Sequence, residues 1–145
     1  MTLKEHCALT GVAAVTLIPF WDAGQIAWFA AGSILIDVDH YILYLQRRRR
    51  FDIKGMFRYF DELEAIQQTI PYVGICLFHT VDFFVLVGLL SLGHPVFLYL
   101  LAGLLFHFVA DLIHLYRCRY LFGRAYCIIE HVVRKRRYGA AYPFC

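Results

Sequence analysis

This sequence of 145 residues lacks the linkers, repeats and disulfide frameworks that divide or cross-link many soluble proteins. It has only four prolines and no Ser/Pro-rich linker, low-complexity tract or internal repeat, which excludes a repeat array and favours one domain over residues 1–145. Its five cysteines show neither CxxC spacing nor the density of a disulfide framework, so we interpret them as reduced packing residues. The amino-terminal stretch lacks a small-residue cleavage site before a soluble domain, which favours a retained first span over a removable signal peptide.

Apolar residues are abundant instead. Hydrophobic residues make up 61% of the chain and aromatic residues 17%, well above the apolar share of an ordinary soluble domain. Four apolar segments can be drawn, at about residues 6–20, 23–45, 71–92 and 95–116. The last three are long enough to cross a hydrocarbon core of about 30 Å at about 1.5 Å of helix rise per residue. We therefore expect an all-α integral membrane protein, a bundle of four transmembrane helices with further helices lying in the interface.

Basic residues follow the second and fourth segments and are missing from the loops after the first and third. They are Arg47, Arg48, Arg49, Arg50, Lys54 and Arg58 in the middle loop, and Arg117, Arg119, Arg124, Arg134, Lys135, Arg136 and Arg137 in a basic tail over 117–145. Because lysine and arginine stay on the cytoplasmic side of short loops, both termini and the middle loop are expected to face the cytoplasm from the cell (inner) membrane.

The same arginines bear on partners. A nucleic acid is not expected, because the runs abut apolar segments, where topology and lipid contact already account for them. Residues 47–50 would lie at the height of the lipid headgroups and attract anionic phospholipids. Apolar residues recur on one helical face over about 56–67, which predicts an interfacial helix, and a second is expected over 120–133.

Histidine and aspartate interrupt all four apolar segments. They are His6 in the first, Asp37, Asp39 and His40 in the second, His79 and Asp82 in the third, and His107, Asp111 and His114 in the fourth. The three in the fourth segment are spaced i, i+4 and i+7, so they share one helical face. Counted inward at about 1.5 Å per residue, the groups other than Asp82 fall in the cytoplasmic half of the bilayer, where one cluster can gather them. Asp82 lies deeper and is expected to orient a ligand histidine without binding the ion.

Charge makes this cluster a candidate metal site. An aspartate at the centre of a membrane helix costs on the order of 2.5 to 3.5 kcal/mol on insertion scales, and no lysine or arginine lies within the four segments to pair with it. Imidazole and carboxylate are ligands of zinc and other first-row divalent metals, so a bound cation explains the pattern better than polar packing between helices. In a regular helix Asp39 would point about 200° away from Asp37, so either the backbone loosens there or Asp39 has another role.

The motifs IDVDH after the second segment and HFVADLIH on the fourth, with His6 near the start, resemble small multi-pass bacterial and archaeal proteins called membrane-bound metal-dependent hydrolases. The family is also labelled as LexA-regulated inner-membrane hydrolases, and the resemblance covers most of residues 6–114. It is thought to be remotely related to zinc-dependent phospholipase C and P1-type nucleases, which hold several zinc ions on helical histidines and aspartates. The resemblance implies one to three divalent ions, with zinc expected, on ligands drawn from His6, Asp37, Asp39, His40, His79, His107, Asp111 and His114.

Two positions depart from the family pattern. Ile36 stands where the family commonly has a proline before the first aspartate, so a helix break there lacks its usual cause. The motif of the third segment usually holds two histidines, whereas only His79 and Thr80 match it here. Thr80 would then stand beside the metal ligands without binding the ion.

The cluster of histidines and aspartates, together with the family resemblance, leads us to expect a membrane-embedded metal-dependent hydrolase. It would cleave a phosphoester or ester of a membrane lipid at the cytoplasmic leaflet. The metal would lower the pKa of water towards about 7 and polarise the substrate oxygen, with Asp37 or Asp39 as proton acceptor. The alternatives are a non-enzymatic metal-binding protein or metal transporter, a haem-binding bundle, and a scaffold without metal. The apolar outer halves at 26–31 and 96–105 weigh against transport, and the neighbouring aspartates weigh against haem.

Overall fold

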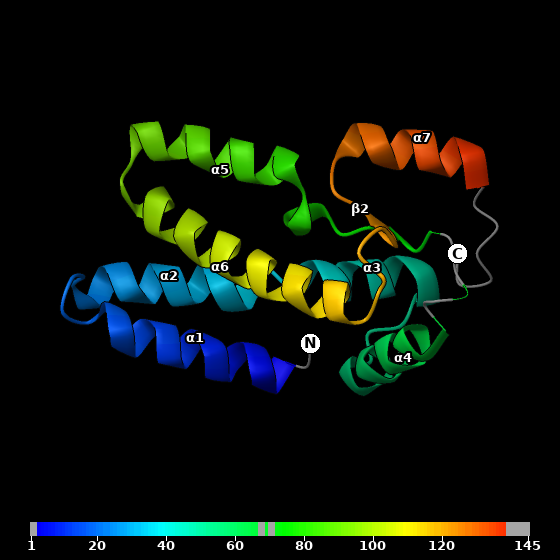
Figure 1. The fold of residues 1–145 in the computed structure, drawn as a ribbon, viewed down its shortest axis with the longest axis horizontal. Coiled ribbons are helices and arrows are strands. Elements are labelled where there is room, and N and C mark those ends of the chain that lie inside the picture. The colour runs from blue at the N-terminus through cyan, green and yellow to red at the C-terminus, as the bar shows by residue number, and fades with distance from the viewer. Residues whose placement is uncertain (1–2, 67–68, 70–71, 139–145) are drawn as a thin grey trace.

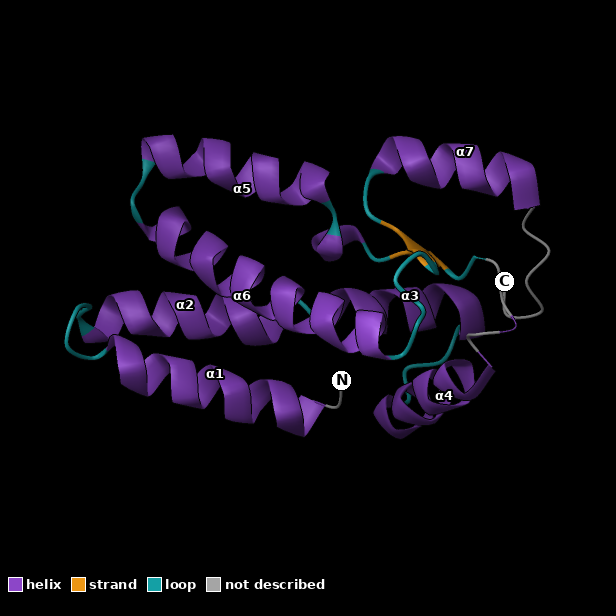
Figure 2. Cartoon of the chain, in the orientation of Figure 1, coloured by secondary structure: helices purple, strands orange, loops and turns teal. Residues whose placement is uncertain are grey.

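The computed structural model describes residues 3–66, 69 and 72–138, and these form a helical bundle (Figures 1 and 2). In chain order the elements are α1 (Leu3–Leu17), α2 (Ala23–Leu35), α3 (Val38–Arg48), α4 (Ile53–Ile66), β1 (Gly74–Ile75), the 3-10 helix η2 (Leu77–His79), α5 (Val81–Gly93), α6 (Val96–Arg117), β2 (Arg124–Ala125) and α7 (Ile128–Tyr138). The predicted all-α class is confirmed. Helices α1, α2, α5 and α6 pack together at one end of the molecule, and α3, α4 and α7 surround the other (Figure 1).

Two helical units in the described part of the chain are long and apolar enough to cross a membrane. One is Ala23–Arg48, which comprises α2 and α3, and the other is α6. Helices α1 and α5 have 15 and 13 residues, so each is shorter than a hydrocarbon core of about 30 Å at about 1.5 Å per residue. The fourth predicted segment, 95–116, therefore matches α6 closely, whereas four transmembrane helices are not confirmed.

A turn at Ile36 and Asp37 separates α2 from α3 without a proline. Ile36 is 1% exposed and packs in the core with Phe84, Val87 and Leu104, which fixes the turn from its apolar side. The carboxylates of Asp37, in the turn, and of Asp39, in the first turn of α3, both lie near Nδ1 of His40, at 3.5 and 2.8 Å.

Two buried glycines bring α2 and α6 into backbone contact. A Cβ on Gly32 would lie 2.2 Å from the carbonyl oxygen of Leu100, and a Cβ on Gly103 would lie 2.0 Å from that of Phe29. Small residues at such positions allow helices to approach closely where dispersion contacts, rather than exclusion of water, hold them together. The close approach positions the backbone of α2 against polar side chains of α6.

In the third predicted segment, 71–92, the α-helix begins only at Val81, after β1 and the 3-10 helix η2, so the prediction of one continuous helix is wrong over residues 72–80. β1 instead pairs in parallel with β2, with Gly74 opposite Arg124. Gly74 has φ of +142°, which strains any residue with a side chain, and a Cβ there would meet the Arg47 guanidinium. Thr80 then begins α5, because its hydroxyl accepts a hydrogen bond from the backbone N–H of Phe83 at 3.2 Å.

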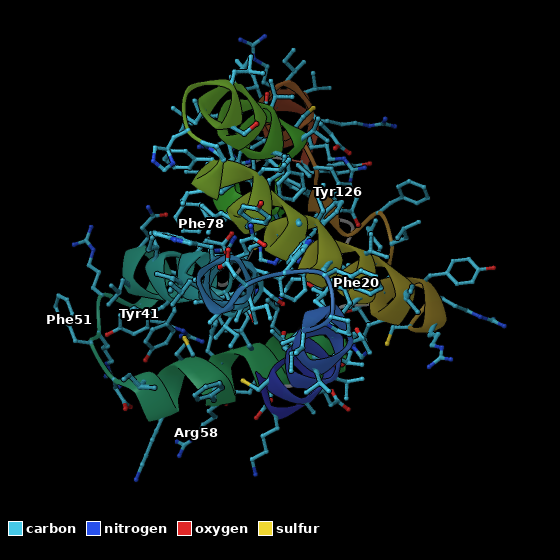
Figure 3. All side chains as sticks on the ribbon, turned by 90° about the vertical axis from the view of Figure 1, so that its left-hand side faces the viewer. Phe20, Tyr41, Phe51, Arg58, Phe78 and Tyr126 are labelled. Carbon is cyan, nitrogen blue, oxygen red and sulfur yellow. The ribbon has the colours of Figure 1, made fainter. Side chains whose placement is uncertain are left out.

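Helix α4 has the apolar and polar faces expected of the helix predicted over about 56–67. The last residue of that prediction, Gln67, lies outside the described residues. Tyr59 and Leu63 are buried against Tyr44 of α3. Arg58 is exposed and points away from the other helices (Figure 3). The helix is therefore amphipathic, with its apolar face used for packing on α3.

The second interfacial helix, predicted over 120–133, begins later, at Ile128, and continues to Tyr138. Arg124 and Ala125 form β2 instead, because they pair with β1, a partner distant in the sequence. The last residues of the predicted basic tail, 139–145, lie outside the described part of the chain.

Candidate metal centre

His107 lies on the face of α6 that meets α2 and is 1% exposed. Its Nδ1 donates a hydrogen bond to the carbonyl oxygen of Ser33 at 2.7 Å, an acceptor that the glycine contact between the helices brings within reach. Its Nε2 lies 3.3 Å from Oδ1 of Asp37. Since a carbonyl can only accept, the proton of the neutral ring is on Nδ1 and the lone pair is on Nε2.

His79 ends η2 and has no exposed surface. Its Nδ1 donates to Oδ2 of Asp39 at 2.9 Å, and the same oxygen accepts the backbone N–H of Phe78 at 2.9 Å. Its Nε2 lies 3.6 Å from Oδ1 of Asp37 and 3.7 Å from Oδ2 of Asp111. The ring of His79 is therefore oriented by Asp39 and directs its second nitrogen between two other carboxylates.

His6 and Asp111 complete this part of the cluster. Nε2 of His6 lies 3.2 Å from Oδ1 of Asp111, and the His6 ring stacks on the His107 ring at 3.8 Å between centroids. His6 is in the second turn of α1, whose first residues lie at the middle of the bundle near the break between α2 and α3 (Figure 1). Four stretches that are distant in the sequence thus meet at one buried place.

The donor set fits a divalent metal. The Nε2 atoms of His79 and His107 are buried and have no hydrogen-bond partner among the described residues. An unpaired buried nitrogen costs on the order of 1 to 3 kcal/mol, so two of them facing carboxylates call for a cation or protons between them. Histidines that use Nδ1 on a carbonyl or carboxylate and present Nε2 outward are the usual form of protein metal ligands. His6, His107 and Asp111 form one group of three ligand atoms within 4.8 Å, and Asp37, His40 and His79 form another.

Asp39 and His40 have a different relationship to the cluster. Oδ1 of Asp39 accepts from Nδ1 of His40 at 2.8 Å, so its two oxygens together serve both neighbouring histidines. Asp39 is 3% exposed, whereas the side chain of His40 is 23% exposed. Nε2 of His40 lies 3.9 Å from Sγ of Cys76. Asp39 is therefore placed to orient two imidazoles, and His40 keeps its second nitrogen at the edge of the cluster.

A pocket of about 170 Å³ lies beside these residues, between α3, α4, α6 and the strand pair. Its walls include His40, Cys76, Asp111, His114, Tyr120 and Arg124. Asp111 and His40 belong to both the pocket and the cluster of candidate ligands. The pocket therefore reaches from the buried ligands towards the exposed side chain of Glu64.

His114 does not join the buried groups of potential ligands that the described residues form. Its Nε2 lies 3.4 Å from Oε1 of Glu64 and 3.7 Å from Sγ of Cys118, and these three residues form a separate group nearer the surface. The spacing of His107, Asp111 and His114 on one face of α6 holds, but only the first two reach the buried cluster.

The remaining predicted residues lie around the site. Thr80 has no exposed surface and caps α5 directly after His79. Asp82 accepts the backbone N–H of Ile128 at 2.9 Å, so it connects α5 to the start of α7. Arg47 donates to the hydroxyl of Tyr59 at 2.9 Å and to the carbonyl of Val73, which ties α3 to α4 and to the segment before β1. The side chains of Arg48, Arg49 and Arg50 are exposed.

Arg124 is the main residue of the site that sequence reasoning missed. Its Nη2 donates to Oδ2 of Asp111 at 2.9 Å, and its side chain is 12% exposed. Burial alone would lower the pKa of the guanidinium, but the Asp111 carboxylate more than offsets this, so the pKa of Arg124 lies above its ordinary value. In the sequence Arg124 is one of many arginines after the fourth segment, and no local signal separates it from the rest.

No protein-family model matches the chain, and no curated protein or solved structure matches it either.

Proposed function

We propose that this chain is a membrane-embedded metal-dependent hydrolase that cleaves a phosphoester or ester of a membrane lipid. The observation that carries the proposal is the pair of buried Nε2 atoms, on His79 and His107, that face Asp37 and Asp111 while each Nδ1 is held by an acceptor. Zinc is the ion we propose first, because imidazole nitrogen and carboxylate oxygen are common zinc ligands. The motif resemblance to membrane-bound metal-dependent hydrolases agrees with the same proposal.

The surface of the helices supports a membrane location. Only 28% of the apolar window of Ala23–Arg48 and 22% of that of α6 is buried inside the molecule, so most residues of both windows are at least partly exposed. Exposed apolar side chains also cover the outer faces of α1 and α5, for example Val15 at 66% and Leu89 at 61%. Patches of this extent on a monomer indicate contact with lipid or another protein. We propose lipid, with the basic loops in the cytoplasm as the positive-inside rule predicts.

A bound divalent ion would supply a Lewis acid for the substrate oxygen and would lower the pKa of water. The residues proposed to hold it are His6, Asp37, His79, His107 and Asp111. Asp39 is not proposed as a ligand or base, since both its oxygens are used on His40 and His79.

His40 is our candidate proton acceptor. Asp39 accepts from its Nδ1, which leaves the lone pair of the neutral ring on Nε2, 3.9 Å from Sγ of Cys76, and both His40 and Cys76 line the pocket. A carboxylate that fixes the tautomer of a histidine in this way is the arrangement found in catalytic Asp–His pairs. His40 would take a proton from water at Nε2, and Asp39 would stabilise the resulting imidazolium.

A non-enzymatic metal-binding protein is the second candidate, because the same ligands would hold an ion without turnover. The feature that favours an enzyme is the pocket, since it places Asp111 and His40 within reach of a molecule that enters from the side of Glu64. A pure storage or structural site would need no such space beside the ligands.

The test uses the full chain in lipid nanodiscs, with metal content measured by elemental analysis and hydrolysis measured on phosphatidic acid, phosphatidylglycerol and a carboxylic ester lipid, each with and without chelator. We expect bound metal and chelator-sensitive turnover in the unchanged protein, loss of both in His79→Ala, and bound metal without turnover in His40→Gln. His94→Ala, in the exposed turn before α6, is the matched control and should change neither. Folded protein that contains no metal and takes none up would overturn the proposal, and bound metal without turnover on any substrate would favour the non-enzymatic candidate.

A further inference from the structure

Arg124 has an unusual place for a basic residue in this chain. β2 pairs with β1 in parallel register and so fixes the Arg124 backbone opposite Gly74, at the wall of the pocket. Its guanidinium is largely buried, and the Arg124 Cζ lies 5.9 Å from the centre of the Tyr126 ring. One nitrogen, Nη2, is used on Asp111. The Nε–H is buried and has no hydrogen-bond partner among the residues that the structure describes.

The guanidinium therefore has an unused donor beside the candidate ligands. A guanidinium carries five N–H donors in a planar fork, and this shape matches two oxygens of a phosphate or carboxylate. The contact with Asp111 uses Nη2 and leaves the neighbouring Nε–H without an acceptor among the described residues. An oxygen of a bound molecule in the pocket could satisfy Nε while the molecule also reaches the ion held by Asp111.

The charges around the pocket favour an anionic molecule. Asp37, Asp39 and Asp111 in the cluster and Glu64 in the pocket wall contribute four negative charges, and Arg124 contributes one positive charge. Counted with neutral histidines, two divalent ions would leave this set with one net positive charge, which an anionic molecule could neutralise. A carboxylic ester brings no charge of its own, whereas a phosphoryl group does.

We propose that Arg124 binds a phosphoryl oxygen in this pocket, so that the substrate class of the site is a phosphoester and not a carboxylic ester. The inference rests on the proposed function, because it names the substrate of the same site. Arg124 would be a substrate-binding residue whose guanidinium contacts Asp111 through Nη2 and the phosphoryl group through Nε.

The direct test is binding of inorganic phosphate to the metal-loaded full chain in nanodiscs, measured by calorimetry and by the phosphate-dependent rise in unfolding temperature. We expect Arg124→Gln to weaken phosphate binding by about tenfold or more and Arg124→Lys to weaken it almost as much, since lysine keeps the charge but loses the fork. Arg117→Gln removes an exposed arginine from the end of α6 and is the matched control, which should bind phosphate as the unchanged protein does. Metal content is measured in every variant, because a residue that only braces Asp111 would lose metal and phosphate together.

Further arms of the experiment separate the possible sources of the phosphoryl group. Nanodiscs that contain phosphatidic acid test a lipid phosphate, and free glycerol 3-phosphate in nanodiscs of neutral lipid tests a soluble one. Phosphate binding that is equal in Arg124→Gln, Arg124→Lys and the unchanged protein would overturn the role of Arg124. If neither variant folds, the unchanged protein still decides: metal-loaded protein that phosphate neither binds nor stabilises overturns the inference. Failure to bind metal at all would instead overturn the proposed function.

Discussion

Nδ1 of His107 donates to the carbonyl oxygen of Ser33 across the contact between α6 and α2. The acceptor is a backbone atom about one helical turn before the break at Ile36 and Asp37, so its position depends on how closely the two helices approach. That one bond selects the tautomer of His107 and directs its Nε2 towards Asp37. The helix packing and the chemistry of the candidate site are therefore coupled through the Ser33 carbonyl.

Replacement of His79 or His107, whose buried Nε2 atoms have no hydrogen-bond partner among the described residues, should remove the ion. In His79→Ala and His107→Ala we expect the metal content to fall by about tenfold or more, because each loses a direct ligand. Elemental analysis of protein purified in detergent measures this, and circular dichroism checks that the helices remain. If both variants keep the metal content of the unchanged protein, the assigned cluster does not hold the metal.

Asp39→Asn should weaken metal binding without removing any proposed ligand. The amide cannot accept two imidazole N–H groups with both of its polar atoms, so the rings of His40 and His79 lose their common anchor. Loss of such an outer partner lowers metal affinity by about 10- to 100-fold. Competition with a chromophoric chelator gives the affinity.

Asp82→Asn is the control for that measurement. Asp82 accepts the backbone N–H of Ile128, a bond that the asparagine oxygen can still accept, and it lies outside the groups of candidate ligands in the described chain. Equal affinities in the two aspartate variants would contradict the orienting role given to Asp39.

Gly103→Ala tests whether the close contact between α2 and α6 is needed. The added Cβ would lie 2.0 Å from the carbonyl oxygen of Phe29, so the helices must separate or the backbone must shift. We expect the free energy of unfolding to fall by at least about 1 to 3 kcal/mol, and metal to be lost because the Ser33 carbonyl moves away from His107.

Gly11→Ala is the matched control on α1, since nothing lies within 4 Å of the added Cβ there. Alanine favours a helix interior over glycine by about 1 kcal/mol, so this variant should be as stable as the unchanged protein or slightly more stable. Thermal unfolding in detergent compares the two alanine variants. A Gly103→Ala protein of normal stability and metal content would show that the contact is not required.

The sequence predicted the parts of this fold that depend on local pattern. Helix α6 could be placed because Pro95 precedes it and a largely apolar stretch of helical length continues up to Arg117. The break after α2 could only be raised as one possibility, since it depends on the burial of Ile36 among Phe84, Val87 and Leu104, residues distant in the chain.

The extended segment before α5 was not predicted, because it is stabilised by a pairing between Gly74 and Arg124 that no periodicity reveals. The same limit applied to the candidate site. The types and spacing of the histidines and aspartates indicated a metal cluster, but which of them are candidate ligands and which orient other side chains depends on contacts between segments that are distant in the chain. Arg124 could not be predicted as a site residue, because its role depends on its contact with Asp111 and its position at the pocket. Both arise only in the folded chain.

His114→Ala tests whether His114, which has the helical spacing of a ligand, belongs to the metal site. His114 shares a face of α6 with His107 and Asp111, and the sequence pattern therefore predicted it as a ligand of the same cluster. In the structure it lies with Glu64 at the wall of the pocket, and these two residues and Cys118 form a group nearer the surface than the buried groups. We expect His114→Ala to retain the bound metal of the unchanged protein, whereas Asp111→Ala loses about tenfold or more, because Asp111 contacts His6 and His79 as well as Arg124. Metal content measured on the two variants side by side decides the point. Equal loss in both would mean that the ion extends to His114, and the buried cluster would then have to be redrawn to include the group at Glu64.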